Sequence, residues 1–148
     1  MKSLLIACLI LSLQSFNVFA QTVVESSDGV SLTIKSSNRI ITIGGAVTET
    51  AYALGFGDNV VATDASSTYP RQVFQLPRVP YVRNLTAEGI LALAPDLILS
   101  SSDANPVSAI QQIRNAGTNM LLIKEQESLE GANNKLAVIG KALNAEES

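Results

Sequence analysis

The stretch "RIITIGGAVTETAYALGFGDNVVATD", Arg39 to Asp64, decides the fold, because its hydrophobic pattern changes from strand to helix and back to strand. Residues 39–43 form a β-branched and nearly continuous apolar run, which is typical of a strand buried on both faces. A glycine pair then releases the backbone into a turn, and residues 46–57 predict a helix that ends at a glycine. Residues 59–64 predict the next strand.

The same alternation continues along the chain. Further strands are predicted over 30–34, 96–101 and 119–123. Three further helices are predicted: one begins at Thr86, one has Asn105 as its N-cap, and one begins near Ser128. Strands and helices that alternate with short links indicate βαβ units, a parallel sheet and right-handed crossovers. We therefore predict the α/β fold class, with ligands binding at the carboxyl ends of the strands.

Composition excludes several classes of function. The chain has 148 residues, 47% of them hydrophobic, and a net charge of −3 with no basic run, so a nucleic-acid partner is not expected. It contains no histidine, so a Ser/His/Asp or Cys/His catalytic centre cannot be built and we predict that the protein is not an enzyme. The acids, among them Asp28, Asp64 and Asp103, fall mostly at turns and helix starts and are expected to be solvated or capping groups.

The first twenty residues, "MKSLLIACLILSLQSFNVFA", have the layout of a cleavable secretory signal peptide: an early Lys2, an apolar run over 4–13, and small or apolar residues before Gln21. The segment around Cys8 looks like the lipobox of a lipoprotein signal, but the apolar run continues past it, so this interpretation is rejected. Without residues 1–20 the chain has no cysteine. An exported, periplasmic location is expected.

The link between Asp64 and Thr86 is long and contains three prolines, and loops of that length are more often functional than idle. It ends in "VPYVRNLTAEG", where Tyr81 and Arg83 are two residues apart and would point to the same side of an extended segment. A neighbouring cation and a ferric ion both stabilise a phenolate, so the pair could form an oxygen ligand for iron. From the residues alone, a packed loop tyrosine beside a solvated arginine remains the alternative.

These motifs carry a resemblance to a known family. The order of "T-E-x-x-x-A-L-G" (48–55) and "L-x-P-D-L-I-L" (93–99) resembles the amino-terminal lobe of periplasmic substrate-binding proteins of ABC importers for haem, cobalamin and iron-siderophores, from Arg39 to the end. "Y-V-R-N-L-T-A-E-G-I-L-A-L", which begins at Tyr81, is more similar to the haem-binding HmuT/ShuT/PhuT-type branch.

The resemblance implies roles for three residues. Tyr81 matches the axial ligand of haem iron, and Arg83 matches the basic residue that supports it. Glu88 matches the acid that docks on the permease, although an acid in the first turn of a helix also suits the helix dipole. The implied ligand is haem, as transported cargo. The implied partners are the ABC permease and ATPase complex of the inner membrane, and an outer-membrane haem receptor system.

The resemblance also implies a domain organisation. It comprises a signal peptide (1–20), an N-terminal extension with an edge strand (21–38), a substrate-binding lobe (39–127) and the start of an interlobe helix (128–148), with a second lobe expected beyond that point. Two alternatives stay open: the same fold binding cobalamin or a ferric siderophore, and an exported α/β domain of other function. The absence of tryptophan and the aromatic content of only 5% weigh against a siderophore site.

Overall fold

The computed structural model describes residues 21–144, so the predicted signal peptide and Cys8 lie outside the described residues. The α-helices and strands, in chain order, are β1 Thr22–Glu25, β2 Ser31–Ile34, β3 Ile40–Ile43, α1 Gly45–Ala53, β4 Val60–Asp64, β5 Arg78–Val79, α2 Ala87–Leu91, β6 Leu97–Ser101, α3 Val107–Asn115, β7 Asn119–Ile123 and α4 Leu129–Leu143. No helix within the described residues is long and apolar enough to cross a membrane.

Five strands form one parallel sheet in the order β5-β4-β3-β6-β7. The chain runs outward from the central β3 to β4 and β5, and then returns through α2 to β6 on the other side of β3. The strand order therefore reverses between β3 and β6, which is where open α/β sheets bind ligands. The predicted α/β fold with a parallel sheet is confirmed.

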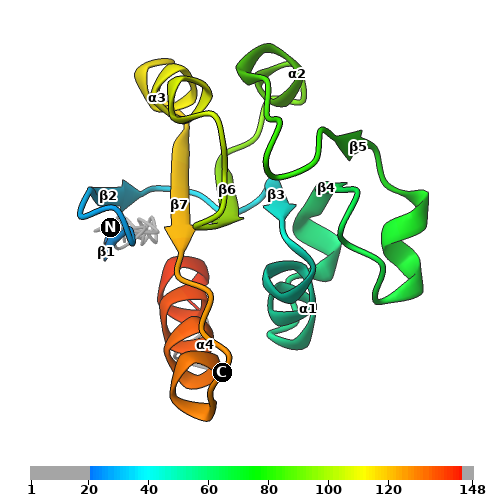
Figure 1. The fold of residues 1–148 in the computed structure, drawn as a ribbon, viewed down its shortest axis with the longest axis vertical. Coiled ribbons are helices and arrows are strands. Elements are labelled where there is room, and N and C mark those ends of the chain that lie inside the picture. Colours follow the sequence, from blue (N-terminus) through cyan, green and yellow to red (C-terminus); the bar gives the residue numbers. More distant parts are fainter. Residues whose placement is uncertain (1–20, 145–148) are drawn as a thin grey trace, which may run out of the picture.

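Helices cover both faces of this sheet, as Figure 1 shows, with α2 and α3 above it and α1 and α4 below it. In β6, Leu97 and Leu99 pack in the core below the sheet while Ile98 packs in the core above it. Both faces need apolar side chains, which explains why the strands read as continuous apolar runs rather than as alternating ones.

A two-stranded antiparallel hairpin, β1 and β2, adds to the lower core. The strand predicted over 30–34 is found here as β2, whereas β1 was not predicted from the sequence. Val24 is the one buried residue of β1, too weak a pattern to recognise without its partner. The Ser27 amide donates to the Leu122 carbonyl of β7 over 2.9 Å, which helps to hold the hairpin against the sheet.

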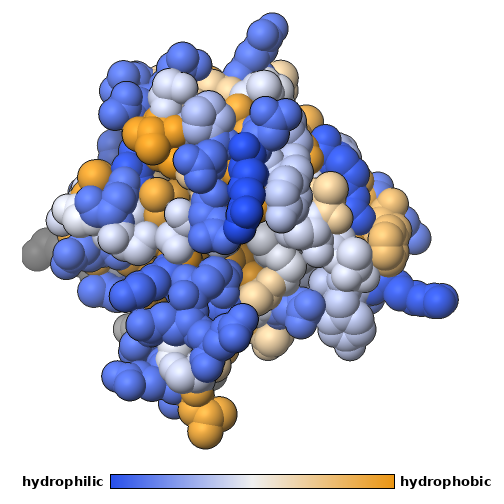
Figure 2. Space-filling model, in the orientation of Figure 1, coloured by the Kyte–Doolittle hydropathy of each residue, from blue (hydrophilic) through white to orange (hydrophobic). Residues whose placement is uncertain are grey.

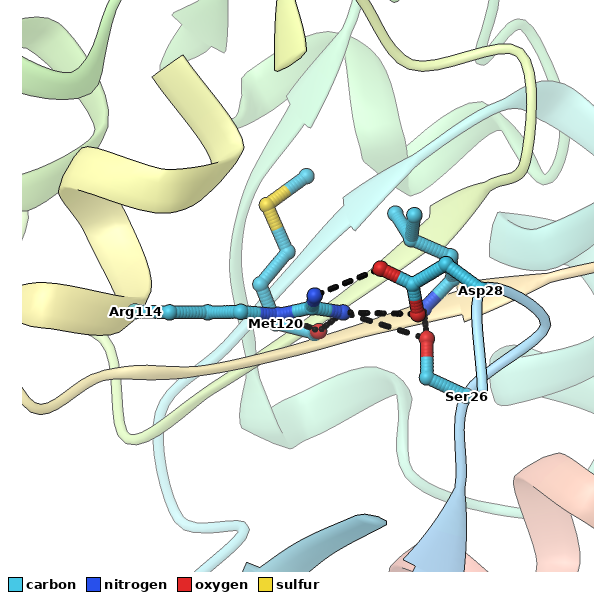
Figure 3. Close-up of polar contacts among 5 residues, drawn as sticks. Ser26, Asp28, Arg114 and Met120 are labelled. Atoms are coloured by element: carbon cyan, nitrogen blue, oxygen red, sulfur yellow. Dashed lines mark hydrogen bonds and ion pairs between the residues drawn. The ribbon is translucent and has the colours of Figure 1, made fainter. Parts of the chain in front are cut away.

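Arg114 of α3 completes this attachment, as Figure 3 shows. Its guanidinium lies 2.6 Å from an Asp28 carboxylate oxygen and donates to the Ser26 hydroxyl and to the Met120 carbonyl. The hydrogen bond from Arg114 lowers the pKa of Asp28 to about 2, against a smaller opposing effect of burial. Asp28 is exposed at a turn, as expected of a solvated acid, but it also forms this ion pair, which was not predicted from the sequence.

Two helix starts differ in detail from the sequence prediction. Asn105 was expected at the N-cap of α3, but the N-cap is Pro106, and the Asn105 side chain instead donates to the Asp103 carbonyl over 2.9 Å. Thr86 is the N-cap of α2 as predicted, without a capping hydrogen bond from its side chain. Within the long link between Asp64 and Thr86, Arg71–Gln75 form a 3₁₀ segment.

Candidate functional site

Tyr81 lies two residues after β5, at the carboxyl edge of the sheet, where ligands are expected. Its position depends on β5, which pairs with β4 through Thr63–Arg78 and Asp64–Val79. Arg78 strengthens this pairing by donating to the Thr63 hydroxyl over 2.9 Å and to the Asp64 carbonyl over 2.6 Å. The Tyr81 side chain is 48% exposed, so its phenol is accessible from outside.

Residues 81–84 form a tight turn rather than the extended segment that the sequence analysis assumed. The Asn84 amide donates to the Tyr81 carbonyl over 2.7 Å, which closes the turn. Val82 and Leu85 are buried, whereas Tyr81 and Arg83 are both exposed. The buried pair therefore anchors the turn and leaves the two polar side chains on the outside.

The turn is attached to the loop that follows β6. The Asn105 amide donates to the Val82 carbonyl over 2.9 Å, and the Leu85 amide donates to the Asn105 carbonyl over 2.8 Å. Asp103, in the same loop, receives a hydrogen bond at its backbone carbonyl from the Asn105 side chain. The loop after β5 and the loop after β6 lie on opposite sides of the switch point between β3 and β6. Hydrogen bonds thus connect these two loops through their backbones.

Arg83 forms an ion pair across these two loops. Its Nη2 lies 3.2 Å from Oδ2 of Asp103, and the two side chains are 66% and 55% exposed. From the sequence, Arg83 is expected beside Tyr81 and Asp103 is expected to be a solvated or capping acid. Neither expectation includes this pair, whose partners lie 20 positions apart. The pair forms because the loops after β5 and β6 meet at one edge of a parallel sheet, and the two-residue β5 has no sequence pattern that would have indicated this.

Asp64, at the carboxyl end of β4, is fully buried and receives several hydrogen bonds. Its carboxylate accepts from the Gly44 amide over 3.0 Å, and from the hydroxyls of Ser66 and Ser67. The Ser67 hydroxyl lies 2.7 Å from that of Thr48 on α1. These contacts lock the turns after β3 and β4 together beside the switch point. The expectation that Asp64 is solvated is therefore wrong, although it does cap a backbone amide.

Glu88 is not part of the ion pair between Arg83 and Asp103. It is exposed in the first turn of α2, where the helix dipole stabilises a carboxylate. The ion pair of Arg83 is with Asp103 and not with Glu88. The structure therefore brings Arg83 and Asp103 together, with Arg83 in the same turn as Tyr81, and leaves Glu88 exposed on α2.

Exposed aromatic side chains gather in the link that the sequence analysis singled out. Tyr69, Phe74 and Tyr81 all lie in it, and each is at least 48% exposed. Arg78 lies over the Phe74 ring, 5.4 Å from its centroid, in a cation–π arrangement. Among residues 21–144 no group of three or more His, Cys, Asp or Glu side chains could hold a metal ion.

A hollow of about 470 Å³ lies elsewhere, at the amino end of β4, and its lining includes Tyr52, Asp58 and Val60. Burial raises the pKa of the Tyr52 phenol, and the negative charge of Asp58 adds to this effect. A raised pKa disfavours the phenolate form of Tyr52, which makes this side chain a poor oxygen ligand for a metal ion. We therefore place the candidate site at the carboxyl edge.

Comparison with known proteins shows the family of this chain. A family model described as periplasmic binding protein matches residues 40–148, which include β3 to α4. This chain belongs to the periplasmic binding protein family. Members of this family bind transported substrates, which agrees with the prediction that the protein is not an enzyme.

Three similar proteins illustrate the family, and two of them are named for a ligand. The chain is 32% identical over 135 residues, 90% of its length, to an uncharacterised ABC transporter substrate-binding lipoprotein, YvrC, of Bacillus subtilis. It is 38% identical over 88 residues, 60% of its length, to a vitamin B12-binding protein of Yersinia pestis. It also resembles the solved periplasmic haem-binding protein BhuT in complex with two haems, with a TM-score of 0.71, 40% identity and 76% of this chain covered.

All three matches extend over only part of the similar protein. The chain spans 43% of the length of YvrC, 31% of the vitamin B12-binding protein and 43% of BhuT. The shared part of BhuT is similar in fold as well as in sequence. The family and the fold of this part are therefore established.

Proposed function

We propose that this chain is the amino-terminal lobe of a periplasmic substrate-binding protein that captures ferric haem and delivers it to an inner-membrane ABC permease for iron uptake. In this proposal residues 1–20 direct export and are removed, and an outer-membrane receptor system supplies the haem. The observation that carries it is the exposed Tyr81 phenol at the carboxyl edge of the sheet, with Arg83 in the same turn.

Tyr81 is proposed as the axial ligand of the haem iron, because a phenolate is a hard oxygen donor that suits a ferric ion. Arg83 would stabilise the negative charge of the phenolate or pair with a carboxylate of the ligand. The turn that holds them is anchored by buried Val82 and Leu85, so both side chains are presented by a fixed backbone. The similarity to a protein named as haem-binding supports this proposal.

The test of the iron ligand is a visible absorption titration with haemin. The wild-type protein is expected to give a high-spin spectrum of the tyrosinate type, and Tyr81→Phe is expected to lose it, because the phenyl ring has no oxygen to bind iron. Tyr69→Phe is the matched control, since Tyr69 is also exposed and lies in the same link. An unchanged spectrum in Tyr81→Phe would show that Tyr81 is not the axial ligand of the haem iron.

The second candidate is cobalamin binding by the same fold, favoured by the 38% identity to the Yersinia vitamin B12-binding protein. Such a site would not need an iron-binding tyrosine. A competition experiment with haemin, cobalamin and a ferric hydroxamate siderophore separates the candidates. Displacement of bound haemin by cobalamin at equal concentration would favour the second.

A further inference from the structure

We infer that Asp103 limits the charge preference of the site: its carboxylate is a built-in counter-ion of Arg83 that a carboxylate of the ligand has to replace. The inference rests on the proposed function and adds a specificity-determining residue to it. Arg83 gives the site a preference for tetrapyrroles with ionised carboxylates over those whose side chains are neutral amides or esters, and Asp103 reduces that preference.

Arg83 can exchange Asp103 for a carboxylate of the ligand without a change in the fold. The backbones that carry Arg83 and Asp103 are joined by hydrogen bonds through Asn105 and held by buried Val82 and Leu85. The ion pair itself lies outside this framework, with side chains 66% and 55% exposed. Rotation of two exposed side chains is therefore enough to release the guanidinium.

The energetics also favour an exchange. An exposed ion pair between flexible side chains is weak and changes an equilibrium constant by a factor of about one to five. Arg83 makes a single contact with one Asp103 oxygen at 3.2 Å, not a two-pronged one. A ligand carboxylate that approaches Tyr81 can therefore displace Asp103, whereas a neutral amide or ester lacks the charge to do so.

Asp103 then acts on charged ligands in two ways. It occupies the guanidinium in the free protein, and it repels a ligand carboxylate that comes close. Both effects weaken the binding of a carboxylate ligand, and neither acts on a neutral one. Asp103 is thus a positioning residue that acts through Arg83 and limits the affinity of the site for anionic ligands.

The test compares Asp103→Asn with wild type, using haemin and haemin dimethyl ester as probes. The variant is expected to bind haemin about three- to tenfold more tightly and the ester within about twofold of wild type, since only haemin carries ionised carboxylates. Asp103→Glu should restore the wild-type ratio of the two affinities. Asp58→Asn is the matched control, because it removes one exposed acid near the amino end of β4 and should leave the ratio unchanged.

A purely structural role for Asp103 predicts a different result. It predicts that both probes bind less well to Asp103→Asn and that the tyrosinate-type spectrum changes; either finding, or equal gains for the two probes, overturns the inference. In an Arg83→Gln background the gain from Asp103→Asn should fall below about twofold, because no guanidinium is left to release and only the repulsion between Asp103 and the ligand carboxylate is removed. Failure of wild type to bind haemin would overturn the proposed function as well, whereas haemin binding without the charge preference overturns only this inference.

Discussion

The arginines of this chain differ in how firmly they are held. Arg39 donates to two backbone carbonyls, and Arg114 contacts Asp28, Ser26 and a carbonyl of β7. Arg83 instead makes one exposed ion pair at 3.2 Å. Several simultaneous hydrogen bonds fix a guanidinium in place, whereas a single exposed ion pair leaves it available for a ligand.

The Asp28–Arg114 pair predicts a pH-dependent contribution to stability. The pKa of Asp28 is lowered from 3.8 to about 2, so its ionised form stabilises the folded state above about pH 4 and this contribution is lost as the pH falls towards 2. Asp28→Asn should lower the free energy of unfolding by about 1 kcal/mol at neutral pH, a value reduced for solvent screening because the carboxylate is 36% exposed. Urea unfolding at several pH values measures the difference, which should disappear near pH 2.

The matched control for this prediction is Asp58→Asn, which removes an exposed acid outside the ion pairs of residues 21–144. It should change the free energy of unfolding by less than about 0.5 kcal/mol at any pH. A pH-independent loss in Asp28→Asn would mean that the carboxylate stabilises through packing rather than through its charge.

At the scale of elements, the turns after the strands do most to shape the candidate site. The turn after β3 passes close to β6, and Gly44 adopts φ 108°, a conformation that side chains rarely allow. A Cβ added there would lie 3.2 Å from the Cβ of Ser101. The Gly44 amide also donates to buried Asp64, so this turn ties β3, β4 and β6 together.

Gly44→Ala should therefore destabilise the fold by about 2 to 3 kcal/mol, from backbone strain and close contact together. Gly140→Ala in α4 is the matched control, because a Cβ there meets nothing within 4 Å and its φ is not positive. That change should be neutral or stabilise by up to about 1 kcal/mol, since alanine favours a helix. Thermal or urea unfolding of both variants measures the contrast, and equal effects would contradict it.

At the scale of the whole molecule, the surface seen in Figure 2 is mainly hydrophilic, with small separate hydrophobic groups. One lies at the lower end, near the start of α4. Leu129, the first residue of α4, is 87% exposed. The helical faces of the sheet are distinct from its carboxyl edge. Glu88 lies on α2 above the sheet, and Tyr81 lies at the edge, so the proposed docking and ligand sites can act separately.

Glu88→Arg should consequently leave haemin affinity within about twofold of wild type and reduce delivery to a reconstituted permease about tenfold or more, through reversal of charge at the docking surface. The measurement is haem uptake by membranes that contain the transporter. Glu130→Arg is the matched control, because Glu130 is also an exposed first-turn acid, on α4 below the sheet. Uptake equal to wild type in Glu88→Arg would refute the docking role.

The parallel α/β fold could be predicted because its signals are local. A strand buried on both faces must be apolar at nearly every position, so β3, β6 and β7 are visible as apolar runs, and β4 follows from its place in the alternation. The two-residue β5 has no such pattern, because it is defined only by its pairing with β4. For the same reason β1 could not be predicted, because it is defined by its pairing with β2 in the hairpin.

For the candidate site, too, some features could be predicted from the sequence and others depend on the tertiary structure. The sequence by itself determined the fold class, the importance of the link after β4, and Tyr81 and Arg83 as the residues to test, since residue type and spacing are local properties. Only the tertiary structure decided that Arg83 pairs with Asp103, that Asp64 is buried under four hydrogen-bond contacts, and that Arg114 holds Asp28. Pairs 20 and 86 positions apart meet only because strand ends and helix faces converge in space, and no local pattern records that convergence.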